Sequence, residues 1–282
     1  MKSLIILLLL IIYYYINHRQ EKIKNYIVKI TKNNRIPRII FRSNKSLSVE
    51  KSMEYYCHKK WIQMNPNYSM IWFTDKDELN FMKKLGKTVL STYTKLKPGA
   101  FKGDFWRSCI LYKYGGVYVD SQCTIYDSLD TIFSDCFCDE KHQFISIRDP
   151  KYGNEIQHGI HNGFISCTKK NPFIKQHIKD IIENVKNNYY GNSPLDVTGP
   201  LCLSKSIQKV NNTKKQFKLG KNLGKYNFYL FELEYGPFQY VKKNNDIILR
   251  KKYSLISYFN QKILNKKTTY SSMWKNRDIY NI

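Results

Sequence analysis

The segment Ala100–Asp120 constrains the fold of this chain most strongly. Residues 100–114 predict a helix, which Gly115-Gly116 brings to an end. Val117-Tyr118-Val119 then predicts a short buried strand that stops at Asp120. A helix that leads directly into a buried strand is typical of a sheet with helices packed on its faces. The segment therefore favours an α/β fold.

The rest of the chain supports the same fold class. Ile36–Phe41 predicts a strand, Val49–Met64 a helix and Tyr68–Phe73 a second strand. Strand, helix and strand in this order open a parallel sheet with crossover helices. Further helices are expected over 77–85, over 171–188 and from Thr198-Gly199-Pro200 onward, and further strands over 143–147, over 163–166 and within 225–260.

One domain is the simplest organisation for this sequence. Hydrophobic residues make up 42% of the chain and aromatic residues 15%, which is enough for a packed core and argues against disorder. The sequence shows no internal repeat and no second domain boundary. We therefore expect a single domain over residues 30–282, a Rossmann-like mixed sheet flanked by helices.

The formal net charge of +25 has two interpretations. A polyanionic partner, such as nucleic acid, an acidic membrane or a diphosphate-bearing substrate, would favour such a charge. A general bias toward Lys and Asn, as in Asn211-Asn212-Thr213-Lys214-Lys215, would also produce it. Because the charge is spread along the chain without a single basic stripe, we favour the bias and expect no specific nucleic-acid partner.

The seven cysteines exclude two kinds of site. Their number is odd and the sequence contains no C-x-x-C pair, so it supports neither a zinc ribbon nor a thioredoxin-type redox site. The spacing leaves open whether one or two disulfides form.

The N-terminus carries an unbroken apolar and aromatic run, Leu4–Ile16. As a helix the run spans about 20 Å, less than the roughly 30 Å hydrocarbon core of a bilayer. It fits a secretory signal core, a short signal-anchor helix or a buried first element. No small-x-small cleavage site follows, so we favour an uncleaved anchor with a basic flank over residues 1–24. The expected location is a membrane, with a lumenal domain of the Golgi or ER type, or secretion after cleavage as the second choice.

Four polar side chains of the segment 100–120 are predicted to lie together. Asp104 and Arg107 are one helical turn apart and share a face of the helix. Tyr118 and Asp120 share one side of the strand, and Asp120 stands where the strand ends, the edge at which open α/β sheets bind ligands. A buried Asp–Arg pair alone is equally well explained as a core ion pair. Its position beside Asp120 favours a ligand site.

Such a set suits the transfer of a sugar from a nucleoside diphosphate. That reaction requires stabilisation of the negative charge on the departing diphosphate, which a divalent metal held by oxygen ligands can supply. A carboxylate and a guanidinium can fix sugar hydroxyls by hydrogen bonds and so position the anomeric carbon.

The pattern A-x-x-x-D-x-x-R followed by L-Y-K-Y-G-G-V-Y-V-D resembles the family 32 glycosyltransferases, whose sugar-binding region contains a DXD motif. The family includes mannosyl- and galactosyltransferases, and the resemblance extends from about Ile36 to Trp274. It implies a GT-A fold, a UDP- or GDP-hexose donor, a Mn²⁺- or Mg²⁺-type cofactor and retention of the anomeric configuration. The acceptor would be a glycan, a lipid or a protein.

The resemblance also assigns residues. By it, Asp104 and Arg107 hold the donor sugar, and Tyr118 lines the nucleotide site. Asp120 matches the first Asp of the DXD motif, which helps to place the metal. Asn162 matches an asparagine that precedes a strand near the reacting centre, although it could instead cap that strand.

Two further motifs match the family. Ser272 and Trp274 resemble a C-terminal S-x-W whose loop closes over the diphosphate, although Trp274 could simply pack the C-terminus. Thr198-Gly199-Pro200 matches a turn near the acceptor side.

Two positions depart from the family pattern. Gln122 stands in place of the second Asp of the DXD motif, and its carbonyl brings a metal ligand without charge. Phe41 stands where the family strand continues into a His, and we expect its ring to stack on a nucleobase.

Three functions remain open on the sequence: an active transferase with altered metal dependence, a catalytically impaired transferase-fold protein that binds nucleotide sugar or glycan, and a basic nucleic-acid-associated protein. Retention of Asp104, Arg107, Tyr118 and Trp274 favours the first. The sequence identifies no nucleophile, so a covalent intermediate and a front-face substitution both remain open.

Overall fold

The computed structural model describes residues 36–44, 53–136, 143–150, 158–235, 238–251 and 269–281. The first half of the chain forms β1 (Ile39–Ser43), α2 (Met53–Met64), β2 (Ser69–Phe73), α3 (Asp75–Lys83), α4 (Lys87–Lys95), α5 (Gly99–Tyr114), β3 (Gly116–Val119), β4 (Cys123–Ile125) and α6 (Leu129–Phe133). The second half forms β5 (Phe144–Arg148), β6 (Phe164–Cys167), α7 (Pro172–Lys186), η1 (Pro194–Asp196), α8 (Pro200–Val210), β7 (Gly220–Asn222), β8 (Phe228–Tyr235), β9 (Gln239–Lys243), β10 (Asp246–Lys251) and α10 (Tyr270–Lys275).

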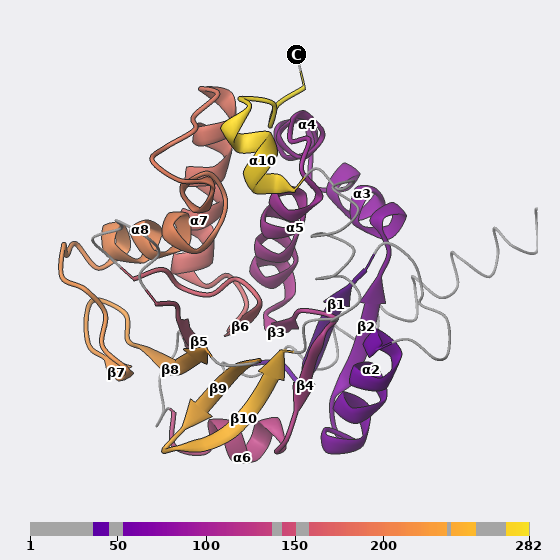
Figure 1. Cartoon of the computed structure of the whole chain (residues 1–282), viewed down its shortest axis with the longest axis vertical. Helices are drawn as coiled ribbons and strands as arrows, with labels where there is room; N and C mark the ends of the chain where they lie inside the picture. Colours follow the sequence, from indigo (N-terminus) through magenta and orange to yellow (C-terminus); the bar gives the residue numbers. More distant parts are fainter. Residues whose placement is uncertain are drawn as a thin grey trace, which may run out of the picture.

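The strands form one large mixed sheet in the order β2-β1-β3-β6-β5-β8-β9-β10-β4, with β7 paired to β8 (Figure 1). β1 runs parallel to β2 and β3, as the strand–helix–strand opening predicts. β6 runs antiparallel to both β3 and β5. β8, β9, β10 and β4 continue the sheet as antiparallel neighbours.

The sheet is curled, and the curl positions the residues discussed below. β3 ends at Val119 and β4 begins at Cys123, so only three residues separate two strands that lie far apart in the strand order. The far end of the sheet must therefore return to the end of β3. Arg42 on β1 fixes this junction, because its guanidinium donates to the backbone carbonyls of Asp120 and Cys123.

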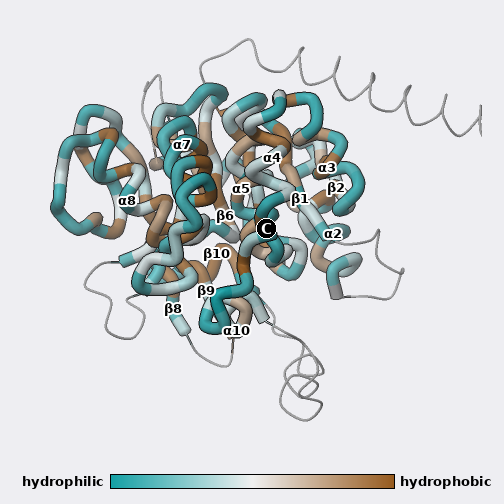
Figure 2. The backbone as a smooth tube through the Cα atoms, turned by 90° about the horizontal axis from the view of Figure 1, so that it is seen from above, coloured by the Kyte–Doolittle hydropathy of each residue, from teal (hydrophilic) through white to brown (hydrophobic). Residues whose placement is uncertain are grey.

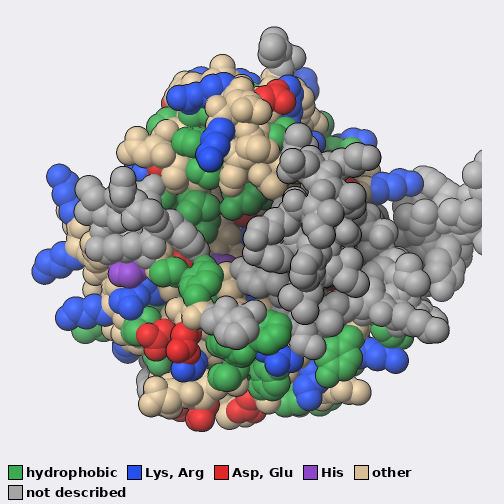
Figure 3. Space-filling view, viewed as in Figure 1, with side chains coloured by type: hydrophobic (Ala, Val, Ile, Leu, Met, Phe, Trp, Pro, Cys, Tyr) green, Lys and Arg blue, Asp and Glu red, His purple; other side chains and the backbone are tan. Residues whose placement is uncertain are grey.

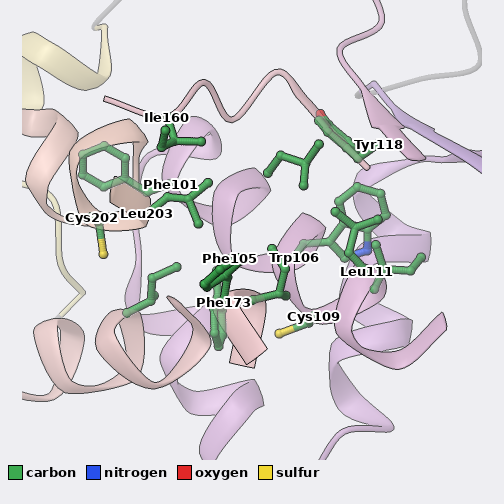
Figure 4. Close-up of a cluster of buried hydrophobic side chains, with 14 of the residues drawn as sticks. Phe101, Phe105, Trp106, Cys109, Leu111, Tyr118, Ile160, Phe173, Cys202 and Leu203 are labelled. Atoms are coloured by element: carbon green, nitrogen blue, oxygen red, sulfur yellow. The ribbon is translucent and has the colours of Figure 1, made fainter. Parts of the chain in front are cut away.

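Each face of the sheet buries its own hydrophobic core. On β1, Ile39 and Phe41 point into the larger core, under α5, α7 and α8, while Ile40 points into the smaller core with α2 and α6. Figure 4 shows part of the larger core, where Phe105 of α5 lies near Phe173 of α7, while the Trp106 ring contacts the ring of Tyr118. In Figure 2 the hydrophobic positions of α7 lie on one side of that helix, as expected for a helix with one buried face.

The structure confirms most of the predicted elements and adds six that the sequence pattern does not predict, namely α4, β4, α6, η1, β7 and α10. The helix predicted at 100–114 spans Gly99–Tyr114, and the strand after it ends at Val119. The sequence pattern predicts no helix at α4, where β-branched residues such as Val89 lower the helix propensity and burial of Tyr93 compensates. β4 has only three residues and depends on pairing with the distant β10.

Two expectations concern cysteines and membrane spans. The six cysteines that the structure describes are free and buried, so no disulfide joins any two of them. None of the described helices is long and apolar enough to cross a membrane. The predicted anchor, residues 1–24, lies outside the described residues.

Candidate functional site

Helix α5 carries two charged side chains into the larger core. Asp104 and Arg107 are both buried, and Arg107 Nη1 lies 3.4 Å from Asp104 Oδ1. Arg107 also donates through Nε to the Gly103 carbonyl at 3.1 Å and through Nη1 to the Asn162 carbonyl at 2.6 Å. The one-turn spacing therefore produces the ion pair that the sequence predicts, and contacts from α5 and the Asn162 loop fix the guanidinium.

Strand β3 brings Tyr118 and Asp120 to the same pair. The Tyr118 hydroxyl donates to Asp120 Oδ1 at 3.0 Å, which confirms that the two side chains share one side of the strand. The Arg107 guanidinium lies 4.4 Å from the centre of the Tyr118 ring, a cation–π contact. Arg107 Nη1 is 3.8 Å from Asp120 Oδ1, so the guanidinium lies between two carboxylates.

Thr198, in the turn before α8, joins Asp104 to Asn162. Its hydroxyl donates to Asp104 Oδ2 at 2.9 Å, and its carbonyl accepts from Asn162 Nδ2 at 3.2 Å and from His177 Nε2 at 3.1 Å. The Thr198-Gly199-Pro200 turn therefore lies directly behind the predicted donor site. Asn162 Oδ1 is a buried acceptor with no partner among the described atoms.

Asp104, Arg107, Tyr118, Asp120 and Asn162 form a polar cluster, and Lys251, the last residue of β10, also belongs to it. The sequence does not indicate this lysine. Its Nζ lies 2.7 Å from Asp120 Oδ2. β10 pairs with β4 so that Lys251 stands opposite Cys123, three residues after Asp120. Only the long-range pairing of these two strands places the lysine here, which no local pattern reveals.

His161 and Gly163 complete the edge of the cluster. His161 Nδ1 lies 2.9 Å from Oδ1 of the buried Asp149, and this carboxylate orients the imidazole. A Cβ atom at Gly163 would lie 2.6 Å from His161 Nε2 and 2.7 Å from Asp120 Oδ2. Position 163 therefore requires glycine if His161 and Asp120 are to keep this arrangement.

The two carboxylates of the cluster differ in electrostatics. Burial raises the pKa of Asp104, and Arg107 opposes this rise only in part. Burial also raises the pKa of Asp120, but the adjacent Lys251 and Arg107 outweigh it and hold that pKa well below its usual range. Asp120 is therefore ionised at every ordinary pH.

Phe41 does not fit the role expected for it. Its ring is fully buried and packs against Phe73 and Tyr114, with centroid distances of 6.3 Å in both pairs. The middle of a parallel strand covered on both faces offers no exposed ring. The structure therefore places Phe41 in the core and not on a surface that a nucleobase could reach.

Ser272 and Trp274 lie on α10, which packs against α5 (Figure 1). The Ser272 hydroxyl donates to the Thr269 carbonyl, and the Trp274 indole donates to the Tyr190 carbonyl at 2.7 Å. Both side chains are only partly buried. The structure thus gives Trp274 a packing role and shows no contact from either residue to the cluster around Asp120 within the described part of the chain. Their predicted role in closing over the diphosphate remains a prediction.

The residues at the DXD position do not fit a divalent metal. Asp120 Oδ2 is already paired with the Lys251 ammonium, and Asp120 Oδ1 accepts from Tyr118. Gln122 Nε2 donates to Glu54 Oε1 at 3.2 Å, so that amide is engaged with an acid on α2. Among the described residues, no three His, Cys, Asp or Glu side chains group to hold a metal ion. A dication here would meet one carboxylate with a cation already on it.

The cluster combines buried hydrogen-bonding groups with a more open end. The side chains of Asp104 and Arg107 are exposed by 12% and 11%, whereas those of Asp120 and Lys251 are each exposed by 23%. The face seen in Figure 3 is hollowed near its centre, over the part of the fold where α5, β3 and β6 meet in Figure 1. Such an arrangement can hold a polar ligand inside and an anionic group toward solvent.

In comparisons with known proteins, this chain is similar to glycosyltransferases. Residues 51–138 match the family described as "Glycosyltransferase sugar-binding region containing DXD motif". "Inositol phosphoceramide mannosyltransferase 3" of Schizosaccharomyces pombe is 24% identical over 67% of this chain and 51% of its own length. "Mannosyl phosphorylinositol ceramide synthase CSH1" of Saccharomyces cerevisiae is 25% identical over 63% of this chain and 45% of its own. The chain thus spans about half the length of these relatives.

A solved structure titled "PaToxG Glycosyltransferase" is also similar. It covers 71% of this chain and 80% of its own at 16% identity, with a TM-score of 0.44.

Proposed function

We propose, from the match of residues 51–138 to the glycosyltransferase sugar-binding region that contains a DXD motif, that the chain transfers a hexose from a nucleotide-diphosphate sugar with retention of configuration. The observation that carries the proposal is the buried contact of Asp104 and Arg107 with Tyr118 and Asp120 at the end of β3. The same four residues lie inside the matched region. We also propose that the curled mixed sheet with flanking helices is of the GT-A type.

In the proposed complex, Asp104, Arg107 and Asn162 bind the hexose. Asp104 and Arg107 offer an acceptor and a fork of donors, and Asn162 Oδ1, an acceptor with no partner within the described part of the chain, suits a sugar hydroxyl. The contacts from Thr198 and the Asn162 backbone hold these groups in place before the sugar binds, which limits the entropy lost on binding.

We propose that the acceptor is a lipid with an anionic headgroup. The two yeast relatives are named for mannosylation of inositol phosphoceramide, which motivates a phosphoinositol lipid as the first acceptor to test. The apolar run Leu4–Ile16 would hold the enzyme at a membrane, next to such an acceptor. A glycan or a protein acceptor remains an outcome of the same test.

The test is a screen of UDP- and GDP-hexoses with the purified full chain, in which released nucleotide diphosphate is measured with and without vesicles that contain inositol phosphoceramide. We expect release from at least one donor, and a glycosylated lipid when the vesicles are present. Binding of a donor without any release would support the alternative that Gln122 motivates, a catalytically impaired protein that binds nucleotide sugar. Absence of both binding and release for every common donor would contradict both functions.

A further inference from the structure

Lys251 pairs with the carboxylate that begins the DXD position. Its ammonium contacts Asp120 Oδ2, and Asp120 is the residue that matches the first Asp of the DXD motif. The backbone fixes this position, because β10 pairs with β4 and aligns Lys251 with Cys123, immediately after the Asp120 turn. The lysine is therefore held at the site by the sheet and is not a surface side chain that happens to reach it.

The charges around Asp120 leave little attraction for a second cation. Arg107 and Lys251 lie on opposite sides of the carboxylate, Nη1 of Arg107 toward Oδ1 and Nζ of Lys251 toward Oδ2. Gln122 adds no negative charge, and its amide donates to Glu54. A dication would have to displace the ammonium or lie beside it, and like charges at such distances repel strongly.

The same charges suit the diphosphate of a nucleotide sugar. Asp104 and Arg107 form the more buried end of the cluster, while Asp120 and Lys251 form the more exposed end. A hexose held at the buried end would direct its diphosphate toward Lys251. An ammonium binds phosphate oxygens through charge-assisted hydrogen bonds, as a point charge without a fixed coordination geometry.

We propose that Lys251 takes the place of the divalent cation, so that this chain binds the diphosphate of its donor without metal. The inference rests on the proposed glycosyltransferase function and identifies the Lys251 ammonium as the positive charge that balances the diphosphate of the donor. During transfer, the bond between the anomeric carbon and the β-phosphate oxygen breaks with its electron pair on that oxygen, and Lys251 balances the added negative charge. The acceptor oxygen, or water in hydrolysis, forms the new bond and releases its proton to the departing phosphate or to solvent.

The test measures binding of UDP and GDP to the full-length protein by calorimetry, in EDTA and in Mn²⁺. For the wild type we expect the Kd of the preferred nucleotide to change by less than about 3-fold between the two conditions. Lys251→Met should weaken binding by about 10-fold or more, and Lys251→Arg, which keeps the charge, by only a few-fold. Lys242→Met removes a lysine from the neighbouring β9 that pairs with Glu234 and should leave the Kd unchanged.

A reciprocal variant makes the test sharper. Lys251→Met combined with Gln122→Asp removes the ammonium and restores the second acid of the motif. We expect this double variant to bind the nucleotide in Mn²⁺ at least about 10-fold more tightly than in EDTA. Thermal unfolding of each variant shows whether a weak Kd reflects loss of the fold, and Lys251→Arg serves as the folded reference.

The outcomes separate this inference from the proposed function. If the wild type releases nucleotide from a donor and EDTA abolishes the release, the proposed transferase activity is supported and the proposed role of Lys251 is wrong. The same holds if Lys251→Met binds as tightly as the wild type. If no donor is turned over but nucleotide binds in EDTA and the binding depends on Lys251, the role of Lys251 is supported and the proposed transferase activity is contradicted. If neither nucleotide binds under any condition, both are contradicted.

Discussion

Single atoms of Thr198 connect the groups that are proposed to hold the sugar. The hydroxyl donates to Asp104, and the carbonyl accepts from Asn162 and His177, so one residue outside the matched region fixes an acid on α5 and an amide in the turn before β6. Thr198 itself is fully buried. Removal of its hydroxyl would leave a buried carboxylate oxygen of Asp104 without its donor, which is costly.

Thr198→Val tests this role against Thr198→Ser as the matched control. A hydrogen bond to a charged group contributes about 2 kcal/mol, so we expect Thr198→Val to lower the free energy of unfolding by about that amount and to reduce donor turnover. Thr198→Ser keeps the hydroxyl and should lose no more than about 1 kcal/mol. Urea denaturation measures both. A larger loss in Thr198→Ser than in Thr198→Val would show that the methyl group matters and the hydroxyl does not.

At this scale, local patterns predict residues that are close together in the sequence, and only the family resemblance adds a distant one, Asn162. Asp104, Arg107, Tyr118 and Asp120 follow from the helical and strand periods within twenty residues. Lys251 and the partner of His161 depend on which strands pair and on where the chain returns. Phe41 shows a different error. Its ring was expected to stack on a nucleobase because of its place in the family pattern, and the burial of the ring excludes that contact.

Among the elements, α7 contacts both α5 and the Thr198 turn through the neutral side chain of His177. His177 Nε2 donates to the Thr198 carbonyl, and Nδ1 faces the Ser108 hydroxyl at 3.0 Å. Burial lowers the pKa of His177 to about 4, an effect that the nearby Asp180 opposes only in part. Because the folded protein resists this protonation and the unfolded chain does not, α7 is a source of acid sensitivity.

The lowered pKa of His177 makes the free energy of unfolding depend on pH. Between about pH 6.5 and pH 4 the unfolded chain binds a proton that the folded protein does not, so stability falls as the pH is lowered through this window. His177 alone contributes at most about 3 kcal/mol of loss. We expect His177→Gln, which can still donate to Thr198, to flatten the curve of unfolding free energy against pH over this window. Parallel curves for the two proteins would contradict the assignment.

Elements with strong local patterns were also the ones that could be predicted. α5, α7, β1, β2 and β3 appear close to the predicted positions because amphipathic spacing and Gly or Pro boundaries define them. α4 and β4 lack such patterns. Tertiary packing of Tyr93 and pairing with β10 stabilise them, which a single sequence does not reveal.

For the molecule as a whole, the curl of the sheet creates the candidate site. The curl brings the last described residue of β10 to the end of β3, although the two are separated by more than half of the sheet order. Asp104 and Arg107 come from the larger core, and Lys251 comes from the opposite end of the sheet. The site is therefore a product of the complete fold and not of the matched region alone.

Membrane attachment is a prediction for the whole chain. If the run Leu4–Ile16 is an uncleaved anchor, the full chain expressed in cells should remain in the membrane fraction after carbonate extraction. A chain that lacks residues 1–24 should become extractable. Extraction of the full chain, or retention of the truncated one, would contradict the anchor, and a shortened N-terminus on the isolated protein would favour signal cleavage.

Comparison of donor turnover in the wild type and in Asp104→Asn tests the central claim most directly. The measured quantity is nucleotide diphosphate released from the preferred hexose donor, with Asp278→Asn, a change in an exposed surface pair with Lys97, as the control. We predict a loss of about 100-fold or more for Asp104→Asn, because the sugar would lose a preorganised charged acceptor, and no loss for the control. Turnover by Asp104→Asn at the wild-type rate would contradict the assignment of this cluster as the donor site.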